Sequence, residues 1–338
     1  MGVNISELLP KKEIKFENLA GKTIAIDYFN MAYQFLSSIR QRDGTPLMDK
    51  KGNITSVYVG LFSRLTRLIT YGIRLCVVFD GVPPKLKAKE QEERKLRKDE
   101  AMFKLKEAIA REDIEEMYKY SKRTSYLTKD MIEDSKLLLK AMGIPVVQAP
   151  SEADAQMAYM NKNGDVWGCA TNDIDPLLHG APRLIMNLTF AQKRKLPSGN
   201  FIFIYPKIIE LENVLQELSI DIDRLIALAI LVGTDYNPEG VPGIGPKRAL
   251  DIVKRYKKIK TIFEEIKPEF DWEEIFGLFK KMPVEKKYRL EWKEPDEEKI
   301  KELLVEKHDF SPERVENTLE KLKKEFEKKK QTGLSKWL

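Results

Sequence analysis

Short apolar stretches of this chain end in acidic residues, and this pattern limits the folds that the chain can adopt. Asp27 ends the run TIAID, and Asp80 ends the run LCVVFD. Two further predicted strands, 144–148 and 166–170, flank a helix that opens at Ser151, and acids follow each of them. In an open sheet of parallel strands, ligands bind at the edge formed by the carboxyl ends of the strands. The pattern therefore predicts an α/β sheet with negative charge gathered on one rim.

The acids after the two later strands are Glu152, Asp154, Asp173 and Asp175. Such a cluster is unstable without cations, which points to a divalent-metal site. A plainer interpretation stays open for each acid alone, because Ser151 with Asp154 resembles a capping box and the later pair would suit a turn. Acids that end apolar strands, such as Asp27 and Asp80, are costly unless something binds them. The set taken together favours the metal site.

The composition restricts which metal and which reaction are possible. Histidine occurs only at His179 and His308, and Cys76 and Cys169 fall inside predicted strands as small buried hydrophobes. A zinc centre and a serine–histidine–aspartate triad are therefore nearly excluded, and oxygen ligands suit Mg²⁺ or Mn²⁺. Two such ions about 4 Å apart activate water and stabilise the leaving oxygen of a phosphodiester. The predicted reaction is metal-assisted hydrolysis.

The order of elements predicts an α/β fold with a mostly parallel central sheet flanked by helices. Other strands are expected at 22–27, 74–79, 184–188 and 201–205, and helices at 30–40, 55–71, 128–143 and 222–232. Residues 85–123 are strongly charged with sparse apolar positions, so they are expected to project from the core. On composition alone they form a solvated helical pair linked by i,i+4 ion pairs.

The charge distribution indicates a nucleic-acid partner. The net charge of +6 combines an acidic cluster with long basic stretches, as expected where cations contact phosphates and metals lie at the scissile bond. No apolar run is long enough to span a bilayer, and the amino terminus lacks a signal-peptide pattern, so membrane insertion and secretion are not expected. Gly2 and Ser6 fit a loose myristoylation pattern, but no polybasic anchor adjoins them.

A glycine-rich turn opens a basic helix within residues 236–256, YNPEGVPGIGPKRALDIVKRY. Gly243 and Gly245 would let the backbone approach a phosphate, while Lys247 and Arg248 follow at the start of the helix. GIGPKRA matches helix–hairpin–helix binders of the DNA backbone, although an ordinary tight turn between helices remains the alternative. Phosphate contacts position a duplex without reading its sequence.

With these residues assembled, the chain resembles the flap structure-specific endonucleases of archaea and eukaryotes, in the XPG/RAD group. The resemblance runs nearly end to end, through IAID, YQFL, TPLMD, VFDGVPP, MGIPVVQAPSEADA, TNDID, GTDYN, GIGPKRA and HDFSPERV. It implies a 5′ nuclease core that cuts near the base of 5′ flaps, with 5′–3′ exonuclease activity, in replication and repair. Magnesium is the implied cofactor, with two ions per site and Mn²⁺ as a substitute.

The resemblance also implies roles for individual residues. The metal-binding carboxylates would be Asp27, Asp80, Glu152, Asp154, Asp173, Asp175 and Asp235, of which the last is added by the resemblance alone. Lys87 and Arg94 would be the basic catalytic pair at the base of a helical arch over about residues 85–130. Tyr33 would stack on a nucleobase. The glycine hairpin would be a helix–two-turn–helix element that holds duplex DNA and a K⁺ ion.

The last residues resemble the motif by which this family binds the sliding clamp (PCNA), and the matching positions are Gln331, Leu334, Trp337 and Leu338. A frayed amphipathic terminus is the alternative.

The implied organisation is a nuclease core over 1–325, comprising an amino-terminal part (1–100), the arch and an internal part (131–256), followed by a flexible tail (326–338). A monomer is expected, located with the DNA in the cytoplasm or nucleoid of an archaeon or in a eukaryotic nucleus.

Three positions depart from the family pattern. Asp154 replaces the commoner glutamate, Asn172 stands where Glu or Gln is usual, and His179 stands where Phe is usual. None of the departures removes a carboxylate.

A non-catalytic binder of branched DNA or a clamp adaptor is the rival hypothesis, and it predicts missing carboxylates. A nuclease preferring bubbles, nicks or junctions is disfavoured by the compact arch and tail, and a small-molecule phosphatase would not explain the hairpin.

Overall fold

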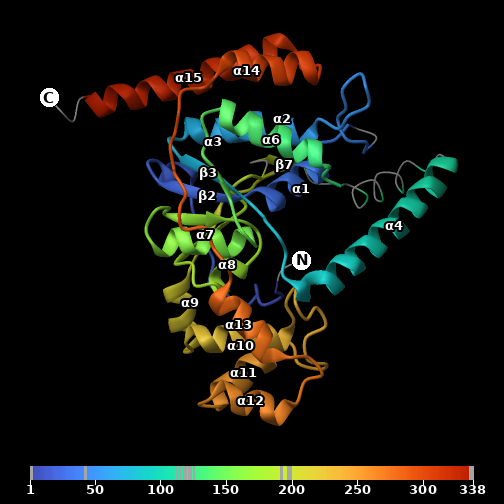
Figure 1. The fold of residues 1–338 in the computed structure, drawn as a ribbon, viewed down its shortest axis with the longest axis vertical. Coiled ribbons are helices and arrows are strands. Elements are labelled where there is room, and N and C mark those ends of the chain that lie inside the picture. The colour runs from blue at the N-terminus through green and yellow to red at the C-terminus, as the bar shows by residue number, and fades with distance from the viewer. Residues whose placement is uncertain are drawn as a thin grey trace.

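The computed structural model describes residues 3–41, 44–111, 113, 116, 120, 124, 126–190, 193–195 and 200–334. This part of the chain forms a central sheet with helices on both faces, as predicted (Figure 1). The strand order in the sheet is β1-β9-β6-β5-β2-β3-β4. The strands are β1 (Lys12–Glu13), β2 (Thr23–Asp27), β3 (Arg74–Phe79), β4 (Val146–Gln148), β5 (Gly168–Ala170), β6 (Arg183–Met186) and β9 (Lys207–Glu210).

The five strands from β4 to β6 pair in parallel, and β9 and β1 add antiparallel pairs at one edge. A strand of this kind is apolar along its whole length because both of its faces are buried. In β2, Ile24 and Ile26 face one hydrophobic core while Ala25 faces the other. Ala25 pairs with Cys76 on β3 and with Cys169 on β5, and both cysteines are free and buried, as expected.

The helices form two layers. One layer holds α1 (Tyr28–Ser38), α2 (Ser56–Gly60), the π-helical turn Leu61–Leu65, α3 (Thr66–Thr70) and α6 (Lys129–Ala141), covered by α14 (Glu297–Lys301) and α15 (Pro312–Leu334). The other holds α7 (Ala153–Lys162), α8 (Asp175–Leu178), α9 (Leu211–Leu218), α10 (Ile222–Val232), α11 (Pro246–Arg255), α12 (Ile259–Ile266) and α13 (Trp272–Lys281). Figure 1 shows the sheet between these layers, with α10 to α13 at the opposite end of the molecule from α14 and α15.

The charged segment does project from the core. After the short 3-10 turn Lys85–Lys87, helix α4 (Ala88–Ala110) runs outward from the body (Figure 1). Its scarcity of apolar residues explains this position, since it has little surface to bury. Helix α6 begins after Thr128, which is its N-cap residue and whose hydroxyl accepts a bond from the Met131 N–H.

Three expectations about secondary structure need correction. Ser151 does not cap α7, because its hydroxyl donates to the Val82 carbonyl and the N-cap residue is Glu152. The basic loop after β6 contains an unexpected strand, β7 (Lys193–Lys195), which pairs with β8 (Phe201–Phe203). The expected tail from residue 326 is helical as far as Leu334.

The extension of α15 follows from its apolar spacing. Val315, Leu319 and Leu322 are buried at intervals of four and three residues, which is the spacing of one helix face. Phe326 continues this face and lines an apolar cavity of about 320 Å³. Among the described residues, no helix has both the length and the apolar content that crossing a bilayer requires.

Candidate active site

The acids that end β2 and β3 lie at the carboxyl edge of the sheet. Asp27 is the last residue of β2 and also caps α1, accepting a bond from the Asn30 N–H at 3.1 Å. Asp80 follows β3 and accepts a bond from the Ala153 N–H at 2.6 Å. Asp80 thus binds the first N–H of α7. Glu152, the N-cap residue of α7, makes no side-chain cap bond, so its carboxylate has other partners.

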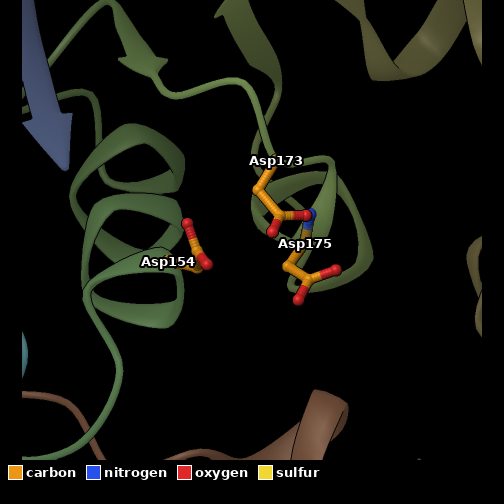
Figure 2. A group of neighbouring side chains, drawn as sticks. All are labelled: Asp154, Asp173 and Asp175. Atoms are coloured by element: carbon orange, nitrogen blue, oxygen red, sulfur yellow. The ribbon is translucent and has the colours of Figure 1, made fainter. Parts of the chain in front are cut away.

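Three aspartates converge in front of this edge (Figure 2). Asp154, in the first turn of α7, faces Asp173 and Asp175, which lie in the turn after β5 and at the start of α8. One carboxylate oxygen from each residue lies within 4.8 Å of the other two. Oδ1 of Asp154 and Oδ1 of Asp175 are buried without a hydrogen-bond donor. Converging carboxylates with unpaired oxygens are the donor set that a divalent cation requires.

The electrostatics of the cluster agree with this interpretation. Burial, followed by the charges of the neighbouring carboxylates, raises the pKa of Asp154 and of Asp175 well above the ordinary value. Burial and the charge of Asp80 raise the pKa of Asp27 to about 7. Burial and the charge of Asp235 also raise the pKa of Asp173. The carboxylates repel one another without a cation, so the cluster fits a divalent metal cofactor.

Lys87 joins two further carboxylates to the cluster. Its Nζ lies 2.5 Å from Glu152 Oε1 and 3.1 Å from Asp235 Oδ2. Burial alone would lower the pKa of the Lys87 ammonium, but the charges of Glu152 and Asp235 outweigh burial and raise it. Asp235 follows a helix, α10, and lies 60 residues beyond Asp175, the last of the other acids, which explains why strand-end patterning did not find it.

The second member of the basic pair, Arg94, lies on α4, and its side chain is outside the described part of the structure. Tyr33 lies on α1, the helix that Asp27 caps, and is 39% exposed. Patterning missed Tyr236, whose phenol donates a hydrogen bond to Oε2 of Glu152. Its only sequence signal is its position next to Asp235.

The glycine hairpin lies between α10 and α11. Gly243 has φ +76°, which favours glycine, and Gly245 is the N-cap residue of α11, with Pro246 in the first turn. A Cβ atom at Gly245 would meet no atom within 4 Å, so packing inside the protein does not require glycine there. The space in front of Gly245 at this helix N-terminus is therefore open, as the predicted phosphate contact would need. Lys247 and Arg248 follow in the same turn.

The residues that resemble a clamp-binding motif are only partly described. The backbones of Gln331 and Leu334 form the end of α15, while their side chains and the whole of Trp337 and Leu338 lie outside the described residues. Gly2 also lies outside them.

Two regions of the sequence match domains of known nucleases. Residues 3–101 match the XPG N-terminal domain, and residues 143–235 match the XPG I-region. Flap endonuclease 1 of Pyrococcus abyssi is 54% identical over 338 residues, which cover 100% of this chain and 98% of that protein. Flap endonuclease 1 of Pyrococcus furiosus is 52% identical, with 100% and 99% covered.

Solved structures of nucleases are also similar to this chain. Flap endonuclease-1 from Methanococcus jannaschii has a TM-score of 0.79 and 46% identity, covering 97% of this chain and 100% of that one. The catalytic core of Rad2 in complex with a DNA substrate has a TM-score of 0.71 at 23% identity, covering 95% and 100%, and shares the fold.

The α/β core, the acidic rim and the matched domains define a DNA nuclease of the XPG type. The full-length identity narrows this class further. The chain belongs to the flap endonuclease family, which confirms the resemblance drawn from its motifs. It is a hydrolase that cuts DNA phosphodiester bonds at flaps, and roles in replication and repair fit the family.

Proposed function

We propose that the acidic rim binds two divalent cations, Mg²⁺ in the cell with Mn²⁺ as a substitute, and that they serve hydrolysis at the base of 5′ flaps. The convergence of Asp154, Asp173 and Asp175 within 4.8 Å, with two buried unpaired oxygens, carries the proposal. Bound there, the ions would supply water activation and stabilisation of the leaving oxygen. The other ligands would come from Asp27, Asp80, Glu152 and Asp235.

Lys87 has a second role in this proposal. Its ammonium pairs with Glu152 and Asp235, two of the proposed ligands. Once a cation neutralises those carboxylates, Lys87 is free to pair with the scissile phosphate and stabilise its developing charge. Arg94 would act with it from α4, and the projecting segment over about residues 85–130 would form the arch that admits a single-stranded 5′ flap. A free 5′ end held in the same way would give the 5′–3′ exonuclease activity.

The DNA itself would lie along the exposed elements around the rim. The N-terminus of α11, with Gly243, Gly245, Lys247 and Arg248, would hold the phosphates of the duplex, with K⁺ bound at the hairpin. Tyr33 would stack on the base next to the cut. The Rad2 core, which shares this fold, is bound to a DNA substrate in its structure, which supports such an arrangement.

The carboxyl-terminal residues would bind the sliding clamp. Gln331 and Leu334 are one helical turn apart at the end of α15, and Trp337 and Leu338 follow. Loss of clamp binding on Trp337→Ala, measured by calorimetric titration with PCNA, would test this role. We propose further that the protein acts as a monomer and works where the cell keeps its DNA.

Flap cleavage with and without the cluster tests the main proposal. A duplex with a labelled 5′ flap is incubated with Mg²⁺ and either the parent, Asp175→Ala or the exposed-acid control Glu217→Gln. We expect cleavage near the flap base by the parent and the control, and none by Asp175→Ala at equal DNA binding. If parent and Asp175→Ala both bind branched DNA and neither cuts, the protein is a binder and the rim has another role.

A further inference from the structure

Glu152 is oriented by two donors that come from outside its own helix. Oε1 accepts the bond from Lys87, and Oε2 accepts the bond from the Tyr236 phenol. The Glu152 side chain makes no cap bond to α7, so the helix itself does not fix its direction. Glu152 and Tyr236 are 6% and 7% exposed, so water does not readily replace the bond between them.

The two donors differ in what else they can do. Lys87 pairs with Asp235 as well and is proposed to move to the scissile phosphate. Tyr236 is buried, and its hydroxyl donates to the Glu152 carboxylate. Tyr236 is therefore the donor that can stay with Glu152 throughout the reaction.

The backbone at Tyr236 is held in place by the turn in which it lies. Its N–H donates to the Thr234 hydroxyl at 3.1 Å. The side chain of Asn237 accepts from the N–H and the hydroxyl of Thr234, and it donates to the Ile230 carbonyl at 2.7 Å. These bonds join the turn to the end of α10, so neither the Tyr236 backbone nor the neighbouring Asp235 can shift freely.

The ring of Tyr236 is held by α13 and α8. It lies edge-on to Phe279 of α13, with ring centroids 5.4 Å apart. The Phe279 carbonyl is near the end of α13, and its helical donor would be the N–H of residue 283, which is a proline and has none. Nδ1 of His179 lies 3.1 Å from this carbonyl and supplies the missing donor.

His179 can donate in this way without being charged. It is buried at the end of α8, the helix that begins with Asp175. The neutral ring then carries its proton on Nδ1. Phenylalanine at this position would keep the ring packing but would leave the Phe279 carbonyl without that donor.

We propose that Tyr236 is a positioning residue that orients the Glu152 carboxylate for the divalent cation, and that His179 and Phe279 hold its ring in place. The inference rests on the cation site proposed above and adds the residues that organise it. Partners that orient a metal ligand in this way are worth about 10–100-fold in metal affinity. Helix α13 thus takes part in cation binding from outside the rim.

Mn²⁺ binding to the DNA-free protein tests this role, with the free ion measured by its paramagnetic resonance. We expect Tyr236→Phe to weaken Mn²⁺ binding about 10–100-fold. Tyr288→Phe is a matched control, because it removes a phenol–carboxylate bond to Asp165 away from the rim, and it should bind Mn²⁺ like the parent. Flap cleavage by Tyr236→Phe should need more Mg²⁺ for half-maximal rate and approach the parental rate at saturation.

The outcomes separate the inference from the proposal on which it rests. Loss of Mn²⁺ binding in Asp175→Ala together with parental binding in Tyr236→Phe would overturn the positioning role alone. Parental binding in Asp175→Ala would overturn the cation site itself. A lower melting temperature in Tyr236→Phe with unchanged Mn²⁺ affinity would show a merely structural role. His179→Phe should weaken binding by a few-fold, and an unchanged affinity would overturn the part assigned to His179.

Discussion

Replacing Asp175 by asparagine should stabilise the metal-free protein while destroying its response to metal. The substitution keeps the shape of the side chain and removes one charge from a cluster whose oxygens lie within 4.8 Å of one another. Two unit charges at that distance repel by about 3.5 kcal/mol at an effective dielectric constant of about 20. Partial protonation and attraction to Lys87 reduce this value. We expect the free energy of unfolding to rise by about 2 kcal/mol in EDTA.

Calorimetry can resolve an effect of this size. With about 2.1 cal/mol/K of unfolding entropy per residue, a chain of 338 residues gains about 3 °C in melting temperature from 2 kcal/mol. In Mg²⁺ the order should reverse. The parent gains about 2.7 kcal/mol when Mg²⁺ is at 100 times its dissociation constant, and Asp175→Asn gains little. Glu217→Gln, which removes an exposed acid far from the rim, should follow the parent in both buffers.

The difference in stability between the parent and Asp175→Asn should depend on pH. The pKa of Asp27 is about 7 in the folded protein against 3.8 as its ordinary value, and the pKa of Asp175 is also raised. Between these values the folded state binds protons that the unfolded chain does not, so its stability falls as pH rises from about 4 to 7. Because the pKa of Asp175 is raised, the advantage of Asp175→Asn over the parent should grow as the pH rises above the ordinary pKa of an aspartate. A variant that is less stable than the parent in EDTA, or a difference that is constant with pH, would refute the reasoning.

Three further substitutions address other parts of the molecule. Lys87→Ala should slow single-turnover flap cleavage about 100-fold at saturating DNA, and a parental rate would remove Lys87 from the mechanism. Lys247→Ala should weaken duplex binding equally for all sequences and reduce the salt slope of log affinity by about 1, measured by fluorescence anisotropy; a sequence-dependent loss would contradict phosphate contact. Gly240→Ala should lower the free energy of unfolding by more than about 2 kcal/mol, because Gly240 has φ +59° and a Cβ would lie 2.4 Å from the Val232 carbonyl. Parental stability in denaturant would contradict that clash.

The sequence alone determined the class of fold and the greater part of the acidic rim. Strands buried on both faces must be apolar throughout, so β2 and β3 can be recognised in the sequence as apolar runs. The acids that end these two strands then stand out from the apolar residues before them. Asp154, Asp173 and Asp175 were found in the same way, since each lies within a few residues of a strand end. Such features depend on local spacing, which a linear pattern preserves.

The N-cap of α7 is a position where local spacing gave a wrong prediction. Ser151 is of a residue type that often caps helices, and it lies just before α7. However, Asp80, which follows β3, accepts the bond from the first N–H of the helix, and the Ser151 hydroxyl donates to the Val82 carbonyl instead. In the same way, the apolar face of α15 has a helical period that the charged residues around it concealed. At α7 a contact with a residue distant in the chain replaced the expected local bond, whereas at α15 the helix follows the local apolar spacing.

Only the tertiary structure decided which groups orient the rim. Lys87, Glu152 and Asp235 meet across 65 and 83 residues of chain, and Tyr236 reaches Glu152 across 84. His179 meets the Phe279 carbonyl across 100 residues, at a helix end that a following proline leaves without a donor. The periodicity of the sequence does not predict these contacts. They depend on how α8, α10 and α13 pack together and not on the order of residues along any one element.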